Sequence, residues 1–187
     1  MKRQIFLVLV LVFLATGGVF AETWWDSYAP GLRDNNFFVN AGIGMGPTGG
    51  YSMGIPPISL ILDYKLPIEL PITVGAVGTF STWKYTPYSY YDSQRYNITY
   101  TNIGIGARGM YHFNLVENLD VYGGLTLGYV IQTRTATAGY TGYPGSSFFL
   151  WGSNIGARYF FTSNLGAYLE LGYSGLNFAS LGVTLKF

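Results

Sequence analysis

The protein has 187 residues, of which 10% are charged, 49% hydrophobic and 18% aromatic, with 26 glycines and no cysteine. Soluble domains carry about 25% charged residues, and a composition this apolar excludes intrinsic disorder. The absence of cysteine excludes a disulfide scaffold, a thiolate metal site and a cysteine nucleophile. The formal net charge of +1 does not indicate nucleic-acid binding, and the length predicts one domain.

The first 21 residues have the pattern of an export signal. A basic start at positions 2 and 3 precedes an apolar run of ten residues, Ile5 to Leu14, and small residues then mark a cleavage site ending at Ala21. The apolar run is too short to cross a bilayer as a helix, so we expect cleavage near Ala21 rather than a retained anchor. Residues 22–36, with Trp24-Trp25, are expected to form a periplasmic leader that acts as an interface plug or a partner contact.

From residue 37 onward, apolar residues alternate with small or polar ones. In Phe37–Met45 the odd positions are apolar, whereas Asn40, Gly42 and Gly44 occupy even ones, and this period of two predicts a β-strand. The alternation recurs in seven further segments, which are Ile58–Lys65, Ile72–Thr82, Asn102–Phe113, Leu119–Gln132, Phe149–Phe161, Leu165–Tyr173 and Ala179–Phe187. Their lengths suit tilted membrane strands of about 9 to 11 residues. Between Tyr96 and Thr101 the parity is reversed, which a β-bulge or the start of a loop would explain.

All charged residues within these eight segments lie on the face that carries the small and polar residues. They are Asp63, Lys65, Arg108, Asp120, Arg158, Glu170 and Lys186. A soluble barrel needs a charged exterior, so the apolar face is expected to contact lipid and the polar face to line a lumen. The sequence therefore predicts an all-β fold, an eight-stranded antiparallel transmembrane β-barrel with up-and-down meander topology, over residues 37–187. The alternative is a soluble lipocalin-like lipid-binding barrel with its faces exchanged.

The connections and the aromatic residues give the barrel a direction. Links after the second, fourth and sixth segments are short, whereas Trp83 to about Arg95, Thr133–Ser147 and Gly46–Pro57 are long and Ser174–Asn177 is a short exception. Outer-membrane barrels combine short periplasmic turns, long external loops and two aromatic girdles. Outward aromatics expected at the short-turn end are Phe37, Tyr64, Tyr111, Phe113, Tyr159, Phe161 and Phe187. Those expected at the long-loop end are Phe80, Tyr129, Phe149, Trp151 and Tyr173.

The lumen of an eight-stranded barrel is just wide enough for side chains or one small ligand. Because buried charges must be paired, we predict an Arg158–Glu170 pair and a pairing of Arg108 with Asp120 or Asp63. The single histidine, His112, is expected to be a satisfied interior residue opposite Asp120 rather than a catalytic one. We expect these residues to form a polar plug, with a selective small-solute path as the alternative, and we expect no enzymatic activity, cofactor or metal.

Two hairpins of the sequence resemble each other. Ile105–Arg108 matches Ile155–Arg158, and Leu125–Tyr129 matches Leu169–Tyr173. With the terminal strand, these segments resemble the small outer-membrane β-barrel superfamily of OmpA/OmpX-type, opacity-type and OmpW-type proteins. The resemblance implies a location in the bacterial outer membrane, and the ending at Phe187 is similar to the signal that the outer-membrane assembly machinery recognises.

The function we predict is that of a non-enzymatic integral outer-membrane protein, monomeric and in contact with lipid, with an envelope structural and adhesin-like role. Its long external loops would contact an extracellular or host ligand, and the tyrosine-rich segment is the candidate contact surface, with Tyr85, Tyr88, Tyr90 and Tyr91. The alternative for these tyrosines is that they cap the barrel or lie among lipid headgroups. The alternative function is a narrow pore or carrier for small or apolar solutes, as the OmpW-type resemblance implies.

Overall fold

The computed structural model describes residues 37–46, 51–68, 70–89, 93–116, 118–137, 145–172 and 176–187. The expected signal and leader, residues 1–36, lie outside these ranges. The strands are β1 (Phe37–Met45), β2 (Ser52–Lys65), β3 (Ile72–Tyr85), β4 (Tyr88–Ser89), β5 (Gln94–Arg95), β6 (Ile98–Val116), β7 (Leu119–Ala136), β8 (Phe148–Phe160), β9 (Leu165–Gly172) and β10 (Ala179–Lys186). None of the described segments forms a helix long and apolar enough to span a membrane.

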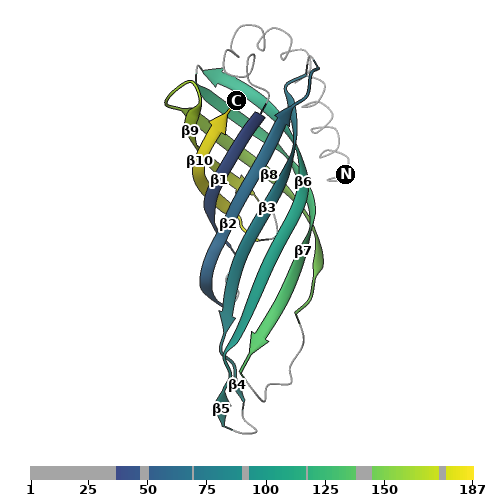
Figure 1. Ribbon diagram of the computed structural model, residues 1–187, viewed down its shortest axis with the longest axis vertical. Helices are drawn as coiled ribbons and strands as arrows, with labels where there is room; N and C mark the ends of the chain where they lie inside the picture. The colour runs from purple at the N-terminus through teal and green to yellow at the C-terminus, as the bar shows by residue number, and fades with distance from the viewer. Residues whose placement is uncertain are drawn as a thin grey trace, which may run out of the picture.

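Eight of these strands close into an antiparallel barrel in the order β1-β10-β9-β8-β7-β6-β3-β2, while β4 and β5 pair as a small separate ribbon (Figure 1). Apart from the closing pair β1 and β10, strands that pair in the barrel are those that follow one another along the chain. This is the predicted up-and-down meander. Closure is made by β1 and β10, paired from Phe38–Lys186 to Met45–Ala179. The predicted eight-stranded antiparallel barrel is confirmed.

The two faces of the barrel wall differ as the alternation indicates. Outward side chains such as Leu125, Leu127 and Ile105 are more than half exposed, whereas the inward positions between them are small, polar or charged. Outward aromatics lie in contact with one another near the short-turn end, where the ring centroids of Phe37 and Tyr64 are 4.8 Å apart. An exterior this apolar is suited to lipid, and Tyr173 of the expected second girdle lies outside the described residues.

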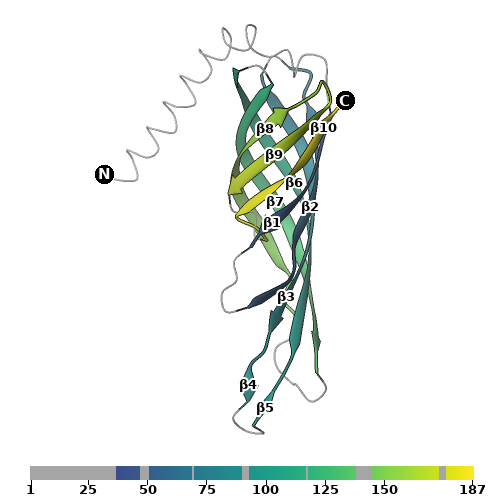
Figure 2. The ribbon, with the colours of Figure 1, turned by 90° about the vertical axis from the view of Figure 1, so that its left-hand side faces the viewer.

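Four neighbouring strands, β2, β3, β6 and β7, are longer than the rest and extend beyond the barrel at the long-loop end (Figure 2). The link expected from Trp83 to about Arg95 is therefore partly strand, because β3 continues to Tyr85 and β4 and β5 form a ribbon beyond it. Similarly, β7 continues to Ala136 and β2 begins at Ser52. The pairing of β2 with β3 is interrupted between Met53 and Ile58, where two prolines lack the N–H that a regular ladder needs.

The reversed parity before Thr101 has a different cause from the expected bulge or loop. β6 pairs with β3 and β7 from Ile98 onward, and neither ladder has a register shift in this part. Ile98 therefore points to the inner side of the sheet, where it is 1% exposed. The strand is regular, and the distribution of residues over its two faces is what changes.

Candidate functional site

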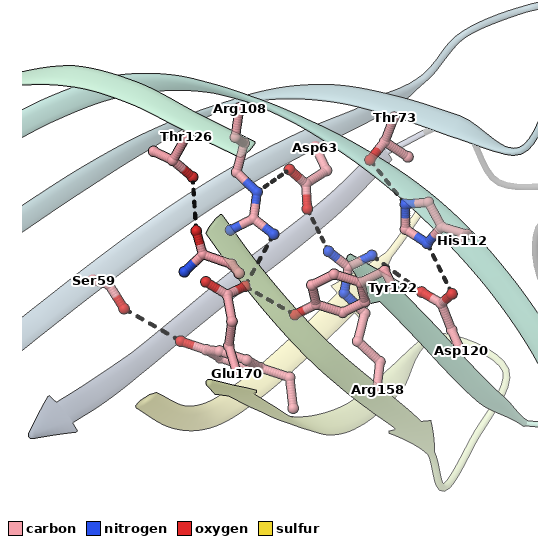
Figure 3. Close-up of polar contacts among 12 residues, drawn as sticks. Ser59, Asp63, Thr73, Arg108, His112, Asp120, Tyr122, Thr126, Arg158 and Glu170 are labelled. Atoms are coloured by element: carbon pink, nitrogen blue, oxygen red, sulfur yellow. Dashed lines mark hydrogen bonds and ion pairs between the residues drawn. The ribbon is translucent and has the colours of Figure 1, made fainter. Parts of the chain in front are cut away.

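The lumen is crossed by a chain of ionised side chains contributed by five strands (Figure 3). Glu170 of β9 lies 2.9 Å from Nη2 of Arg108, and Nε of Arg108 lies 3.2 Å from Oδ1 of Asp63. Arg158 donates to the second oxygen of Asp63 and, at 3.3 Å, to Oδ2 of Asp120. All five side chains are at most 8% exposed. Acids and bases therefore alternate along the chain, and each guanidinium lies between two carboxylates.

Aromatic rings hold the middle of this network. The guanidinium of Arg158 lies 4.5 Å from the ring centroid of Tyr122 and 4.7 Å from that of Phe38. Tyr122 also donates its hydroxyl to Glu170 at 3.1 Å. Gly156 leaves room for this ring, because a Cβ there would overlap the Tyr122 phenol. The inward Gly156 thus makes space for the Tyr122 ring, which contacts both Arg158 and Glu170.

The predicted pair of Arg158 with Glu170 is wrong. In the β8–β9 ladder, Arg158 lies opposite Tyr168 and Glu170 lies opposite Gly156. Arg158 instead reaches its direct neighbour on β7, Asp120, and the carboxylate of Asp63 on β2. Of the two partners considered for Arg108, the structure has Asp63, together with Glu170.

His112 extends the network towards the short-turn end. Its Nδ1 lies 2.8 Å from Oδ1 of Asp120, and its Nε2 lies 2.9 Å from the hydroxyl of Thr73. This order of hydroxyl, imidazole and carboxylate is that of a nucleophilic triad. However, Thr73 and His112 are each 1% exposed, so neither side chain is accessible to solvent. The arrangement satisfies the buried imidazole on both nitrogens.

The two other expected interior charges lie at different depths. Lys186 is 6% exposed, and its ammonium lies 4.3 Å from the ring centroid of Phe160 near the short-turn end. Lys65 lies at the end of β2 and is half-buried. Within the described residues, no group of three or more metal-ligating side chains is suited to hold an ion.

Apolar side chains fill the lumen on the other side of the network. Val130, Leu150 and Leu176 pack together, all at most 7% exposed. Leu176 comes from the link between β9 and β10, which is held to β1 by a hydrogen bond from the amide of Phe178 to the carbonyl of Met45. Between this apolar group and the charges lies a cavity of about 10 Å³, lined in part by Ser59, Thr126, Glu170 and Ser180, which is room for about one water molecule.

Beyond the barrel, residues 52–55, 82–85, 98–101 and 133–136 form what we call the projecting sheet. Pairing of β1 with β2 ends at Ile43–Ile58, and pairing of β8 with β7 ends at Phe148–Val130. Among the described residues, no paired strands therefore lie opposite the projecting sheet.

The outer face of the wall changes character where the projecting sheet begins. The last apolar row of side chains is Ile58, Phe80, Ile103 and Ile131. The next row is Ile55, Thr82, Thr101 and Thr133, and the one after it is Ser52, Lys84, Thr99 and Thr135. Since threonine and lysine replace isoleucine and phenylalanine, the outer face leaves the apolar part of the bilayer between these rows.

The inner face of the projecting sheet changes in the opposite sense. Met53, Trp83, Tyr100 and Arg134 form one row across the four strands, followed by Tyr85, Ile98 and Ala136. Tyr51 adds a further ring, with its centroid 5.2 Å from that of Tyr85 and 5.9 Å from that of Tyr100. Of these residues, the sequence reading identified Tyr85 alone as a contact residue. The reversed parity was the signal that could have found the others.

The remaining expected contact and assembly residues are distributed as follows. Tyr88 lies in β4 and is 46% exposed, while Tyr90 and Tyr91 lie outside the described residues. Phe187 is 60% exposed, and its backbone exchanges two hydrogen bonds with that of Phe37, at 2.9 and 3.2 Å. The C-terminal residue thus continues the closing seam of the barrel.

Comparisons with known proteins agree with this architecture. No protein-family model matches the sequence, and no curated protein matches it. Among solved structures, the outer membrane protein OprG from Pseudomonas aeruginosa matches with a TM-score of 0.58 and 11% identity, over 82% of this chain and 96% of OprG. Neisserial surface protein A matches with a TM-score of 0.52 and 16% identity, over 81% of this chain and 97% of that one. Identities this low establish a shared fold and nothing finer.

The fold, the apolar exterior and the polar lumen together define the class. The chain has the fold of the small outer-membrane β-barrels, and it is built to cross a bilayer with eight strands.

Proposed function

We propose that the protein is a non-enzymatic outer-membrane barrel with a closed lumen, which acts through the surface at its long-loop end. The observation that carries this proposal is the filled interior. The alternating charges from Glu170 to Asp120 cross the lumen, and Val130, Leu150 and Leu176 fill it on the long-loop side. A solute would have to displace side chains that are paired with one another.

Two observations support the absence of catalysis. Thr73, His112 and Asp120 have the contacts of a triad, but all three are at most 4% exposed. Asp120 also accepts a hydrogen bond from Arg158, so its carboxylate serves the structural network. Catalysis requires a reacting atom within hydrogen-bond reach of the base, and both ring nitrogens of His112 are already engaged, by Thr73 and Asp120.

The surface role is supported by the shape of the chain beyond the barrel. Strands that served only to cross the bilayer would need about 9 to 11 residues, but β6 has 19 and β7 has 18. The additional length contributes to the projecting sheet, and the link between β3 and β6 adds the β4–β5 ribbon. In this orientation the short turns face the periplasm and the projecting sheet faces the medium.

Location and assembly form part of the same proposal. Export after cleavage near Ala21 would deliver the chain to the periplasm, and the strand ending in Phe187 would be recognised by the assembly machinery. The outward position of Phe187 at the closing seam supports that role. A monomer with lipid on all sides accounts for the apolar exterior.

The closed lumen is tested by planar-bilayer conductance of the refolded protein. We expect no discrete steps from the full chain, and an Arg108→Ala, Arg158→Ala double variant serves as the opened control. Regular steps from the unaltered protein would overturn the proposal in favour of the narrow pore or carrier.

The surface role is tested on cells that display the protein. The variant replaces residues 86–97 with a two-residue turn, which removes the β4–β5 ribbon and leaves the barrel strands intact. We expect cells with the unaltered protein to adhere to a panel of extracellular-matrix proteins and polysaccharides more than cells that carry the empty vector, and the variant measures the contribution of the ribbon. Adhesion no greater than that of the empty-vector cells on every surface, with folded protein present, would overturn the surface role.

A further inference from the structure

The inner face of the projecting sheet carries aromatic side chains that are only partly buried. Trp83 and Ile98 are 9% and 1% exposed, so they form the packed base of this side. Tyr51 and Tyr85 are 40% and 38% exposed, and Tyr100, one strand further, is half-buried. Tyr51 contacts the rings of both Tyr85 and Tyr100, and the three phenols therefore present open ring area to the medium.

The neighbouring charges are mostly positive. The segments 46–57, 82–101 and 131–149, which make up the long-loop end, contain Lys84, Arg95 and Arg134 against a single acid, Asp92. The acids of the described barrel, Asp63, Asp120 and Glu170, are engaged inside the lumen. Arg134 lies beside Tyr100 in the β6–β7 ladder and on the same face. A cation therefore adjoins the rings.

These two properties select the chemistry of a ligand. Tyrosine rings offer apolar faces with a polar edge and are already ordered by their packing, so they bind at low entropic cost. A sugar ring has the complementary form, with a face of C–H groups and a rim of hydroxyls. The excess of positive charge favours a partner that carries sulfate or carboxylate groups, because complementary potentials attract and orient it.

We propose that the inner face of the projecting sheet binds an acidic polysaccharide from outside the cell. Sugar rings stack on Tyr51, Tyr85 and Tyr100, and an acidic substituent pairs with Arg134. This inference rests on the surface role proposed above and specifies its ligand.

The orientation of the face distinguishes this source from the lipids around the barrel. Sugars of the surrounding outer leaflet meet the outer side of the wall, where Thr133, Thr135 and Lys84 lie. The rings point the other way, towards the barrel axis. A chain that reaches them must approach from the medium above the barrel.

The test uses the full mature chain refolded into lipid nanodiscs and three soluble probes at physiological salt. These probes are dextran sulfate, uncharged dextran of the same length, and poly(vinyl sulfonate), which carries the charge without sugar rings. We expect dextran sulfate to bind at least tenfold more tightly than either of the others, since a tenfold ratio corresponds to about 1.4 kcal/mol. Equal binding of poly(vinyl sulfonate) and dextran sulfate would overturn the proposal.

Variants locate the site on the molecule. Tyr51→Ala and Arg134→Gln are each expected to weaken dextran sulfate binding about tenfold. The matched controls are Tyr129→Ala, a lipid-facing tyrosine that is 47% exposed, and Lys84→Gln, on the opposite face of the same sheet. Tyr129→Ala is expected to bind as the unaltered protein does, and Lys84→Gln to lose only the general attraction of one charge, which is less than Arg134→Gln loses. Heat-dependent gel mobility checks that each variant is folded. A loss for Lys84→Gln equal to that for Arg134→Gln would show attraction without a site and would overturn the proposal.

Two further outcomes distinguish a failure of the polysaccharide assignment from a failure of the proposed surface role. Lipopolysaccharide binding that Tyr51→Ala abolishes would mean that the face takes its sugars from the membrane, which contradicts the proposed source. If displaying cells adhere to matrix proteins while the purified chain does not bind dextran sulfate, the surface role stands and the polysaccharide assignment is wrong.

Discussion

The barrel and the projecting sheet are made from the same strands, yet they distribute their side chains in opposite ways. Within the barrel, β6 and β7 place Ile105 and Leu127 outside and Arg108 and Thr126 inside. In the projecting sheet the same two strands place threonines outside and Ile98 and Tyr100 inside. In the β3–β6 and β6–β7 ladders the exchange occurs within one or two residue pairs and without a bulge, whereas the β2–β3 ladder is irregular at the same level.

The difference shows which medium each part meets. A sheet in lipid must keep its outer face apolar and satisfy polar groups inside, whereas a sheet in water gains free energy by burying apolar side chains on its inner face. The row of Thr82, Thr101 and Thr133 therefore marks the level at which the strands pass from lipid to water.

The largest effect is expected from removing the central acid of the lumen. Asp63→Ala leaves Arg108 and Arg158 with one carboxylate each in a buried site, which costs about 3–5 kcal/mol. The free energy of unfolding, measured by gel mobility in a urea series, should fall by that amount. Thr133→Ala on the projecting sheet is the control and should change it by about 0.5 kcal/mol or less. A small loss for Asp63→Ala would mean that the lumen is wet rather than sealed.

A cation placed on the outer face of the barrel is expected to lower the free energy of unfolding by less than Asp63→Ala does. The same cation on the outer face of the projecting sheet should have little effect. Leu125→Arg, near the middle of the lipid-facing part of β7, should destabilise the fold by about 2–4 kcal/mol, whereas Thr135→Arg should cost about 0–1 kcal/mol. Unfolding in lipid vesicles measures both. Similar losses for the two variants would contradict the assigned membrane boundary.

Two glycine-to-alanine substitutions, one inside the barrel and one on its lipid-facing side, compare how closely the two faces are packed. Gly156→Ala would push the Tyr122 ring away from Glu170, because the new methyl group overlaps that ring. Overpacking of this kind costs about 1–3 kcal/mol. Gly109→Ala on the lipid face has no heavy atom within 4 Å of the added carbon and should leave the unfolding midpoint nearly unchanged. Equal midpoints for both variants would rule out a close-packed lumen.

Single cysteine substitutions on either side of the membrane boundary should change stability least but differ clearly in their accessibility to a water-soluble reagent. Because the chain contains no cysteine, Ile131→Cys and Thr133→Cys each introduce one thiol, at a cost of about 1 kcal/mol or less. A water-soluble maleimide should modify the thiol at position 133 rapidly and that at position 131 slowly in intact vesicles. Rapid modification at both positions would move the boundary towards the barrel centre.

The sequence was sufficient to predict the fold because alternation is a local property. In each strand, the alternation of neighbouring residues shows which side chains share a face. The absence of charge from one face indicates that this face contacts lipid. The inward positions of Asp63, Arg108 and Arg158 followed from parity alone. His112 does contact Asp120, but the expected register is wrong, because the ladder places His112 opposite Tyr122 and Asp120 opposite Asn114.

The pairings across the lumen could not be obtained in that way. Asp63 on β2 meets Arg158 on β8 because the closed barrel brings distant strands to the same level, and this stagger is not written in either hairpin. The prediction for Arg158 took its partner from the adjacent hairpin and therefore chose Glu170. The projecting sheet was missed for a related reason, because a single medium was assumed along the whole of each strand.

The alternating charge network also has a consequence for insertion. Its members come from β2, β6, β7, β8 and β9, and of its carboxylate–guanidinium pairs only Asp120–Arg158 lies between two consecutive strands. The other pairs form only when distant strands are brought together across the lumen. A sheet that entered the bilayer before closing would carry uncompensated ions along one side, at a cost comparable to the stability of a whole domain. Closure of β1 on β10 before the strands meet the lipid interior would avoid this cost.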